Sequence, residues 1–369
     1  MTNRREFLRD VTGATAGIFF TGCGLVDSAL GAMQAGGVNR RQVTVGGRRV
    51  QTIDVHAHIR VSQVWELVKD TEQGKSLEEF LATPDPEVDI TTLDLRIAEM
   101  DRAGIDVQAV SIGRFNIWNW ADRNLADRIV QLQNEKIGEL CAARPDRFVG
   151  LASIAMQHPD LAAQQLDYAV KNLRLRGCAI TTDVNGDELS DPKFHPFWAK
   201  AEQLGAFVFI HPQGFREGAR RFRGNGNLGN SLGSPMATAV ALSHLIQDGT
   251  LDRFPELKIC GAHGGGFLPA SAGRQDQCQN VFRENCKPLK KKPSEYIRQI
   301  YFDTVVFTGE ALRHLVATVG AGQVVVGTDY QSEWNRNAVD HILSTPALSD
   351  ADRRAILGGN AARLLRIGA

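Results

Sequence analysis

Short apolar segments alternate with helical stretches along most of this 369-residue chain. Eight of these segments are rich in Val, Ile and Phe and are too short for buried helices, which is typical of strands. They read "QTIDVHAHI", "VQAVSIG", "FVGLASI", "GCAITTD", "AFVFIHP", "LKICGAHGG", "IYFDTVV" and "QVVVGTD". The connections between them are mostly helical in pattern, and several end in Gly, as helix C-termini often do. This alternation favours an α/β fold built on a parallel sheet.

Eight strands with helical connections predict a (β/α)8 TIM barrel. A doubly wound open sheet is the rival fold, but its glycine-rich dinucleotide fingerprint is missing after the first strand, where the chain reads "HAHIRVS". Two connections, over residues 60–90 and 214–234, are longer than a minimal barrel needs. We therefore expect one barrel over residues 37–369, with inserted loops at its C-terminal face.

The first 36 residues differ from the rest of the chain. An adjacent Arg4–Arg5 pair precedes a mildly apolar stretch and then a run of small residues. This pattern predicts a twin-arginine export signal and linker, and hence a periplasmic or exported protein carried by the twin-arginine machinery. The alternative is an ordinary basic amphipathic N-terminus. Lipid anchoring at Cys23 is not expected, because Phe20 fits poorly at the start of a lipoprotein box.

Charge and cysteine usage exclude several classes of protein. Lys and Arg together number 42, as do Asp and Glu, so no overall field attracts nucleic acid or an anionic membrane. No apolar run is long enough to span a bilayer. Beyond the signal there are five cysteines without paired spacing, which excludes a disulfide scaffold. Cys278 and Cys286 could still pair in an oxidising compartment.

Histidines and one aspartate stand where the predicted strands end. Residues i and i+2 of a strand share a face, so His56 and His58 point the same way. His211 ends the fifth strand, His263 the sixth and Asp329 the eighth. Active sites of barrels form at this face, and buried ionisable groups need partners. Nitrogen and oxygen ligands of this kind suit zinc, with manganese or iron as alternatives.

The order of these residues resembles the amidohydrolase superfamily. The segments "AEQLGAFVFIHP", "FPELKICGAHGGG" and "GTDY" are similar, more narrowly, to the branch containing aminocarboxymuconate-semialdehyde decarboxylase. The resemblance implies that one divalent metal ion is bound by His56, His58, His211 and Asp329. It also implies that His263 acts as acid and base beside the metal, with Asp329 as a second catalytic group. The strand "GCAITTDVNG" lacks the lysine of two-metal members, which predicts a mononuclear site.

The predicted function is metal-dependent decarboxylation of an aromatic or unsaturated carboxylic acid. The alternatives are a metal-dependent hydrolase of a lactone, ester or amide, and a non-catalytic exported metal- or ligand-binding protein. For a small-molecule carboxylate, Arg114 is a candidate clamp and Trp118 a candidate wall of the substrate site. If neither residue contacts substrate, Arg114 is solvated and Trp118 packs in the core. The resemblance also implies a homodimer.

Overall fold

The computed structural model describes residues 40–76, 78, 89–113, 118–330 and 337–368, and Arg40–Ala369 form a compact unit. Its parallel strands fall at the eight predicted positions. They are β3 (Ile53–Ile59), β4 (Val107–Ile112), β5 (Phe148–Gly150), β6 (Gly177–Ile180), β9 (Phe207–Ile210), β10 (Lys258–Gly261), β11 (Tyr301–Asp303) and β12 (Val324–Val325). They pair in the orders β3-β4-β5 and β12-β11-β10-β9-β6.

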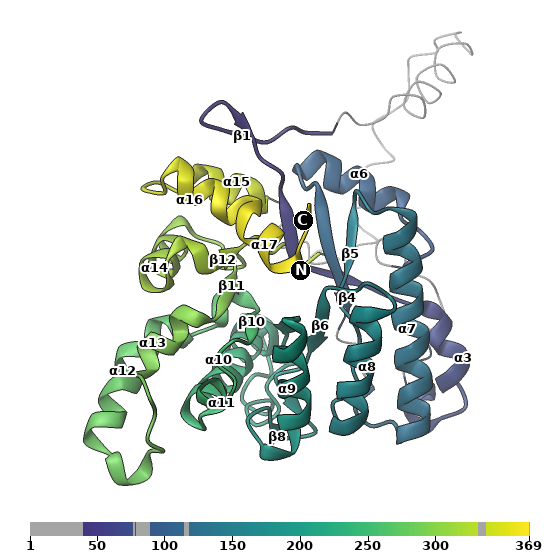
Figure 1. Cartoon of the computed structure of the whole chain (residues 1–369), viewed down its shortest axis with the longest axis horizontal. Helices are drawn as coiled ribbons and strands as arrows, with labels where there is room; N and C mark the ends of the chain where they lie inside the picture. The colour runs from purple at the N-terminus through teal and green to yellow at the C-terminus, as the bar shows by residue number, and fades with distance from the viewer. Residues whose placement is uncertain (1–39, 77, 79–88, 114–117, 331–336, 369) are drawn as a thin grey trace, which may run out of the picture. The chain divides into compact units, whose positions relative to one another are not determined.

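Isolated bridges join these two sheets at both seams. Ala152 after β5 pairs in parallel with Cys178 of β6, and Asp54 of β3 pairs in parallel with Val326 after β12. The Val55 N–H donates to the Val326 carbonyl at 2.9 Å. The strand order therefore closes on itself, and the predicted TIM barrel is confirmed. Figure 1 shows the helices arranged around the central strands.

A packed core fills the barrel interior below the strand ends. Its buried side chains come from β3, β4, β9, β10 and β12, from the residues that directly follow β5 and β10, and from helix α17 (Asn360–Leu365). They are Ile53, Val55, Val107, Ala109, Leu151, Phe207, Phe209, Cys260, Ala262, Val325, Ala361, Leu364 and Leu365. Each large side chain contributes about 1.5–3 kcal/mol by leaving water. This interior cluster, called here the barrel floor, holds the strand ends in a fixed arrangement.

The connections predicted to be helical contain helices. They are α6 (Asp94–Ala103), α7 (Arg123–Ala143), α8 (Pro159–Lys171), α9 (His195–Leu204), α10 (Ser234–Gln247) and α14 (Gly309–Val319). A side-chain cap sets the start of α7: the Asp122 carboxylate accepts from the Asn124 and Leu125 N–H groups at 2.9 and 3.0 Å. Satisfying these otherwise unpaired amides fixes where α7 begins.

Several elements were not predicted from the sequence. Helix α12 (Leu268–Val281) follows β10, and α15 (Ala338–Ser344) and α16 (Asp350–Arg354) precede α17. The long connection after β3 contains the short helices α3 (Trp65–Val68) and α4 (Glu72–Ser76), and α11 (Thr250–Arg253) and α13 (Pro293–Tyr296) are also short. Two hairpins, each made of two-residue strands, also occur: β1–β2 (Thr44–Val45, Arg48–Arg49) and β7–β8 (Asp183–Val184, Asp187–Glu188). No described helix is long and apolar enough to cross a membrane.

Candidate metal centre

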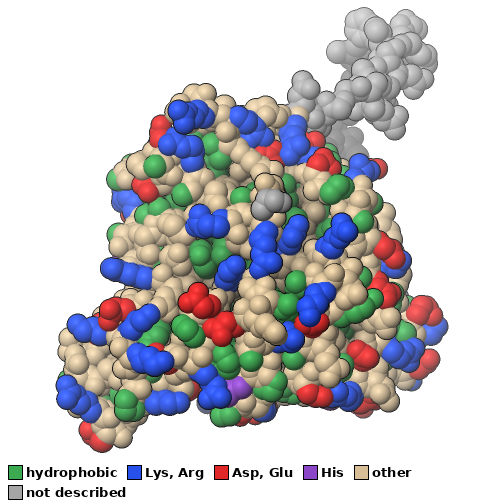
Figure 2. Space-filling model, in the orientation of Figure 1, with side chains coloured by type: hydrophobic (Ala, Val, Ile, Leu, Met, Phe, Trp, Pro, Cys, Tyr) green, Lys and Arg blue, Asp and Glu red, His purple; other side chains and the backbone are tan. Residues whose placement is uncertain are grey.

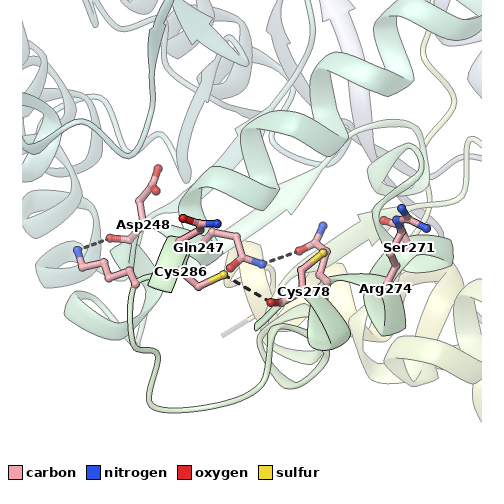
Figure 3. A pocket seen from close by; sticks show the side chains of 9 residues that line it. Gln247, Asp248, Ser271, Arg274, Cys278 and Cys286 are labelled. Atoms are coloured by element: carbon pink, nitrogen blue, oxygen red, sulfur yellow. Dashed lines mark hydrogen bonds between the residues drawn. The ribbon is translucent and has the colours of Figure 1, made fainter. Parts of the chain in front are cut away.

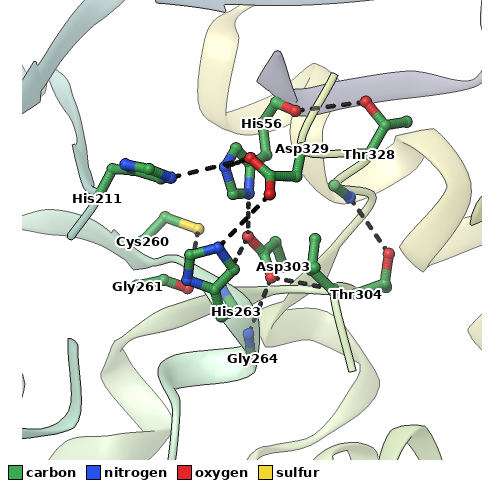
Figure 4. Close-up of polar contacts among 12 residues, drawn as sticks. His56, His211, Cys260, Gly261, His263, Gly264, Asp303, Thr304, Thr328 and Asp329 are labelled. Atoms are coloured by element: carbon green, nitrogen blue, oxygen red, sulfur yellow. Dashed lines mark hydrogen bonds and ion pairs between the residues drawn. The ribbon is translucent and has the colours of Figure 1, made fainter. Parts of the chain in front are cut away.

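The predicted ligands meet at the carboxyl ends of the strands. His56 and His58 lie on β3, whereas His211 and Asp329 follow β9 and β12. One ligand atom from each of the four lies within 4.8 Å of all the others. Figure 4 shows the imidazoles of His56 and His211 directed at the Asp329 carboxylate. The structure therefore brings together the four residues that the sequence proposed as ligands.

Distances within the cluster centre on one carboxylate oxygen. Asp329 Oδ1 lies 3.0 Å from His56 Nε2, 3.2 Å from His58 Nε2 and 3.9 Å from His211 Nε2. The His211 Nε2 atom is buried and has no hydrogen-bond partner in the described part of the chain. An unpaired buried nitrogen is costly unless something binds it. Three imidazoles and a carboxylate converging in this way fit a single divalent ion.

Charge in the cluster is balanced by His56. Burial lowers the pKa of His56, but Asp329 and Asp303 outweigh that effect and raise it to about 10. Burial lowers the pKa of His58 and, more strongly, that of His211, which keeps their lone pairs free to ligate. Burial alone would raise the pKa of Asp329, yet His56 and the other histidines hold it well below its usual range. Without a metal, the His56 imidazolium thus supplies the positive charge that the carboxylates require.

Asp303 supports the cluster from β11, and the sequence analysis missed this role. Its Oδ2 atom lies 2.7 Å from His56 Nδ1 and accepts the His263 N–H at 3.0 Å. Its Oδ1 atom accepts the Gly264 and Val305 N–H groups at 2.9 and 3.1 Å. A carboxylate on Nδ1 fixes the ring of a histidine ligand and presents Nε2 to the metal. The signal was available, because Asp303 ends its strand as Asp329 follows β12.

A β-bulge in β3 places the first two ligands. Asp54 pairs with Gln108 and Ala57 with Val110, so β3 has one residue more than β4 over this span. The Asp54 carboxylate accepts the His56 N–H at 3.0 Å and the Thr328 hydroxyl at 2.6 Å. Burial raises the pKa of Asp54 to about 6, although these hydrogen bonds oppose the rise. Bulges next to active sites re-aim side chains, and this one lets Val55 fill the floor while His56 faces the centre.

His263 and Asp329 both have left-handed backbones, with φ values of 56° and 55°. Such conformations are uncommon for residues other than glycine and concentrate at functional sites. His263 Nε2 faces Asp329 Oδ2 at 3.8 Å, while its Nδ1 atom is buried without a hydrogen-bond partner in the described chain. The glycines that follow have positive φ, and a Cβ on Gly266 would approach the Pro235 carbonyl oxygen to 1.9 Å. The run "AHGGG" is therefore the sequence that this tight turn requires.

The two candidate substrate residues have different outcomes. Trp118 follows β4, is 5% exposed and packs in the main core, while its indole Nε1 has no hydrogen-bond partner among the described residues. A buried indole N–H usually finds a partner, so Trp118 stays a candidate for substrate contact. Arg114 lies outside the described residues.

A closed barrel with this donor set at its C-terminal face is a metal-dependent barrel of the amidohydrolase type. The model of the Amidohydro_2 amidohydrolase family matches residues 53–367, and the chain belongs to that family. The match covers every ligand, and the four residues are the one metal-binding cluster among the described residues. The prediction of a single site for a divalent ion is thereby supported.

Relatives of the chain are decarboxylases. It is 34% identical to the 2-amino-3-carboxymuconate-6-semialdehyde decarboxylase of Dictyostelium discoideum. That alignment covers 74% of this chain and 76% of the relative. The 5-carboxyvanillate decarboxylase structure from Sphingomonas paucimobilis is 28% identical, with a TM-score of 0.78 over 86% of this chain and 99% of that one. A dihydroxybenzoic acid decarboxylase from Polaromonas sp. JS666, with bound manganese and 2-nitroresorcinol, is 26% identical, with a TM-score of 0.73 over 87% and 98%.

Proposed function

We propose that the protein is a metal-dependent carboxy-lyase that decarboxylates an aromatic or unsaturated carboxylic acid. The observation that carries this proposal is the cluster of His56, His58, His211 and Asp329 with His263 beside it, in a chain whose relatives are decarboxylases. A hydrolase of a lactone, ester or amide would use the same donors, but these relatives do not favour that activity.

Proton transfer is the task that the protein side chains have to perform. When bound, a divalent ion supplies a Lewis acid that polarises a substrate oxygen and offsets developing negative charge. The carbon that loses carbon dioxide must also gain a proton. His263 and Asp329 are the groups placed to hold that proton, since His263 Nε2 lies 3.8 Å from Asp329 Oδ2. Asp303 fixes both the His56 ring and the backbone of His263, so that neither has to reorient during the reaction.

We propose zinc as the ion, because a set of three imidazoles and one carboxylate suits its borderline softness. Manganese is the alternative and is the metal bound in the Polaromonas relative. We propose further that Arg114 grips the substrate carboxylate and that Trp118 contacts its conjugated part. An Arg114→Met variant should then raise KM about 10-fold or more while keeping its metal content, as expected for loss of a charge-assisted hydrogen bond.

The test of the proposed function measures metal per chain and carbon dioxide release from 5-carboxyvanillate, dihydroxybenzoates and aminocarboxymuconate semialdehyde. We expect about one zinc or manganese per chain, lost in His211→Ala and Asp329→Ala. His263→Ala should keep the metal and lose about 10²-fold or more in turnover. His314→Ala, at an exposed position on α14, is the matched control and should change neither quantity. A metal-loaded wild type that releases no carbon dioxide from a broad panel of such acids would contradict the proposal.

We also propose that residues 1–36 direct twin-arginine export, so that the protein acts in the periplasm or outside the cell. Its support is the Arg4–Arg5 pair and the apolar stretch after it; both lie outside the described residues. Arg4→Lys with Arg5→Lys should leave the protein in the cytoplasm, as cell fractionation would detect, and normal export of this variant would overturn the proposal.

We also propose, from the family resemblance, that the chain forms a homodimer. Light scattering of the purified chain tests this, and a mass equal to that of one chain would contradict it.

A further inference from the structure

Two cysteines border one cavity at the outer end of α12, away from the strand ends. The cavity has a volume of about 520 Å³ and is lined by Gln247, Asp248, Ser271, Arg274, Gln275, Cys278, Asn285, Cys286 and Lys287. Figure 3 shows both thiol side chains on its wall. Cys278 is exposed and Cys286 half-buried, and both are free thiols.

The chain folds back so that these cysteines meet. The Phe282 N–H donates to the Cys278 carbonyl at 2.9 Å, and the short 3-10 helix η6 (Arg283–Asn285) then turns the chain. The Cys286 thiol donates to the same carbonyl oxygen at 3.7 Å. Since a carbonyl oxygen lies about 2.4 Å from its own Cα, the Cys286 sulfur is at most about 6 Å from the Cys278 Cα. The Cys286 sulfur lies about 2.8 Å from its own Cα, so the two Cα atoms are at most about 9 Å apart, and a disulfide needs them within roughly 7 Å. A shift of about 2 Å or less therefore suffices to form the bond.

This part of the molecule can rearrange at low cost. The buried residues of α12 are Leu268, Pro269 and Ala272, all near its N-terminal end. At the other end, Val281 and Phe282 are 64% and 51% exposed. The contact of this end with α10 is polar, through Gln279 and Gln247 at 2.7 Å. Segments with few buried apolar contacts open most easily.

The other cysteines among the described residues are Cys141, Cys178 and Cys260. Burial raises the pKa of the Cys141 thiol to about 12 and raises those of Cys178 and Cys260 as well. Such thiols are inert, because the thiolate is the reactive form. Arg274 and Lys287 line the cavity beside Cys278 and Cys286. Figure 2 shows Lys and Arg side chains with acidic side chains between them at the α12–α13 end of the face in view.

We propose that Cys278 and Cys286 form a reversible disulfide when the chain meets a disulfide oxidant, either a small molecule or a thiol oxidoreductase. One protein thiolate attacks a sulfur of the oxidant, forms a mixed disulfide and releases the first oxidant thiol. The second thiolate then attacks the protein sulfur of that bond and releases the second thiol. Two protein thiols are oxidised, the oxidant takes up two electrons, and the two protons end on its thiols. The bond would tie the outer end of α12 to the segment that follows it.

Mass spectrometry tests this bond on the full chain, reduced and then treated with oxidised glutathione. Trypsin cuts after Arg274, Arg283 and Lys290 but not between Lys287 and Pro288, so the cysteines fall in peptides 275–283 and 284–290. We expect these two peptides joined, two hydrogen atoms lighter than their sum, and separated again by reduction. Cys141→Ser is the matched control and should keep the link, whereas Cys278→Ser should yield Cys286 as a glutathione adduct.

Separate glutathione adducts or free thiols on both wild-type peptides would overturn the proposal. A link between two copies of the chain, seen as a dimer on a non-reducing gel, would overturn it as well. The proposed export supplies the oxidising compartment but is not needed for this test. If the purified chain forms the disulfide but cell fractionation finds the protein in the cytoplasm, the export proposal fails and the disulfide proposal stands. The measurement does not involve decarboxylase activity.

Discussion

At the scale of single residues, Asp303 supports the metal centre without belonging to the ligand set. Its two oxygens face His56 Nδ1 and the N–H groups of His263, Gly264 and Val305. In Asp303→Asn the side-chain N–H₂ replaces one acceptor oxygen and must face at least one of these N–H donors. That N–H group then stays buried without an acceptor. We expect a loss of about 1–3 kcal/mol in the free energy of unfolding and about 10–100-fold in metal affinity. Urea denaturation and metal titration measure the two losses.

Asp160→Asn is the matched control for Asp303, because it removes the charge of an exposed carboxylate paired with Arg123 at 2.6 Å. Exposed pairs contribute little, so we expect no measurable change in the urea midpoint and no change in metal affinity. If Asp303→Asn destabilised the fold but bound metal as tightly as wild type, its role would be structural only. Sequence reasoning found the ligands because His56, His58, His211 and Asp329 stand at or just beyond strand ends. It passed over Asp303 because a lone carboxylate at such a place resembles an ordinary cap.

At the scale of elements, α6 holds β3 and the segment after β12 through one buried guanidinium. Arg96 donates to the His58 carbonyl at 2.6 Å and to Gln108 Oε1 at 2.8 Å, and it stacks on the Tyr330 ring at 4.2 Å. Burial lowers the pKa of Arg96 to about 10, so the side chain stays charged at neutral pH. In Arg96→Met the two acceptors lose this donor, and we expect a loss of about 1–3 kcal/mol in unfolding free energy with weaker metal binding.

Arg102→Met, on the same helix, tests whether burial is the cause. Arg102 is 66% exposed and pairs with Glu99 at 3.0 Å, so we expect a loss within about 0.5 kcal/mol. Equal losses in the two variants, compared by urea denaturation, would mean that helix propensity and not the buried contact is responsible. The sequence predicted α6 but not this contact, because a charged residue in an amphipathic helix is normally placed on the solvent side. The bulge in β3 was hidden for a related reason, since strict alternation assumes a regular strand.

At the scale of the whole molecule, metal binding, pH and stability are linked through His56. In the metal-free protein the pKa of His56 is about 10, so its proton contributes stability that is complete below the unfolded pKa of about 6.5 and is lost as pH rises through about 10. A metal requires the deprotonated ring and must displace that proton. We therefore expect metal affinity to rise about tenfold per pH unit between about 7 and 9, with about one proton released per ion.

Thermal unfolding and calorimetry in two buffers of different ionisation enthalpy measure this linkage. At a free ion concentration about 100-fold above Kd, binding adds about 2.7 kcal/mol to the free energy of unfolding, so Tm should rise with metal. At one fixed ion concentration this rise should be larger at higher pH, because the metal-free protein loses stability as His56 loses its proton while the metal-bound protein does not. His263→Ala should keep the metal-dependent shift, because His263 lies outside the ligand set, whereas Asp329→Ala should abolish it. A shift in Tm that is the same at pH 7 and 9 would show that His56 is already neutral before metal binds. The two carboxylates on either side of its ring would then have to be balanced by a proton held elsewhere in the cluster.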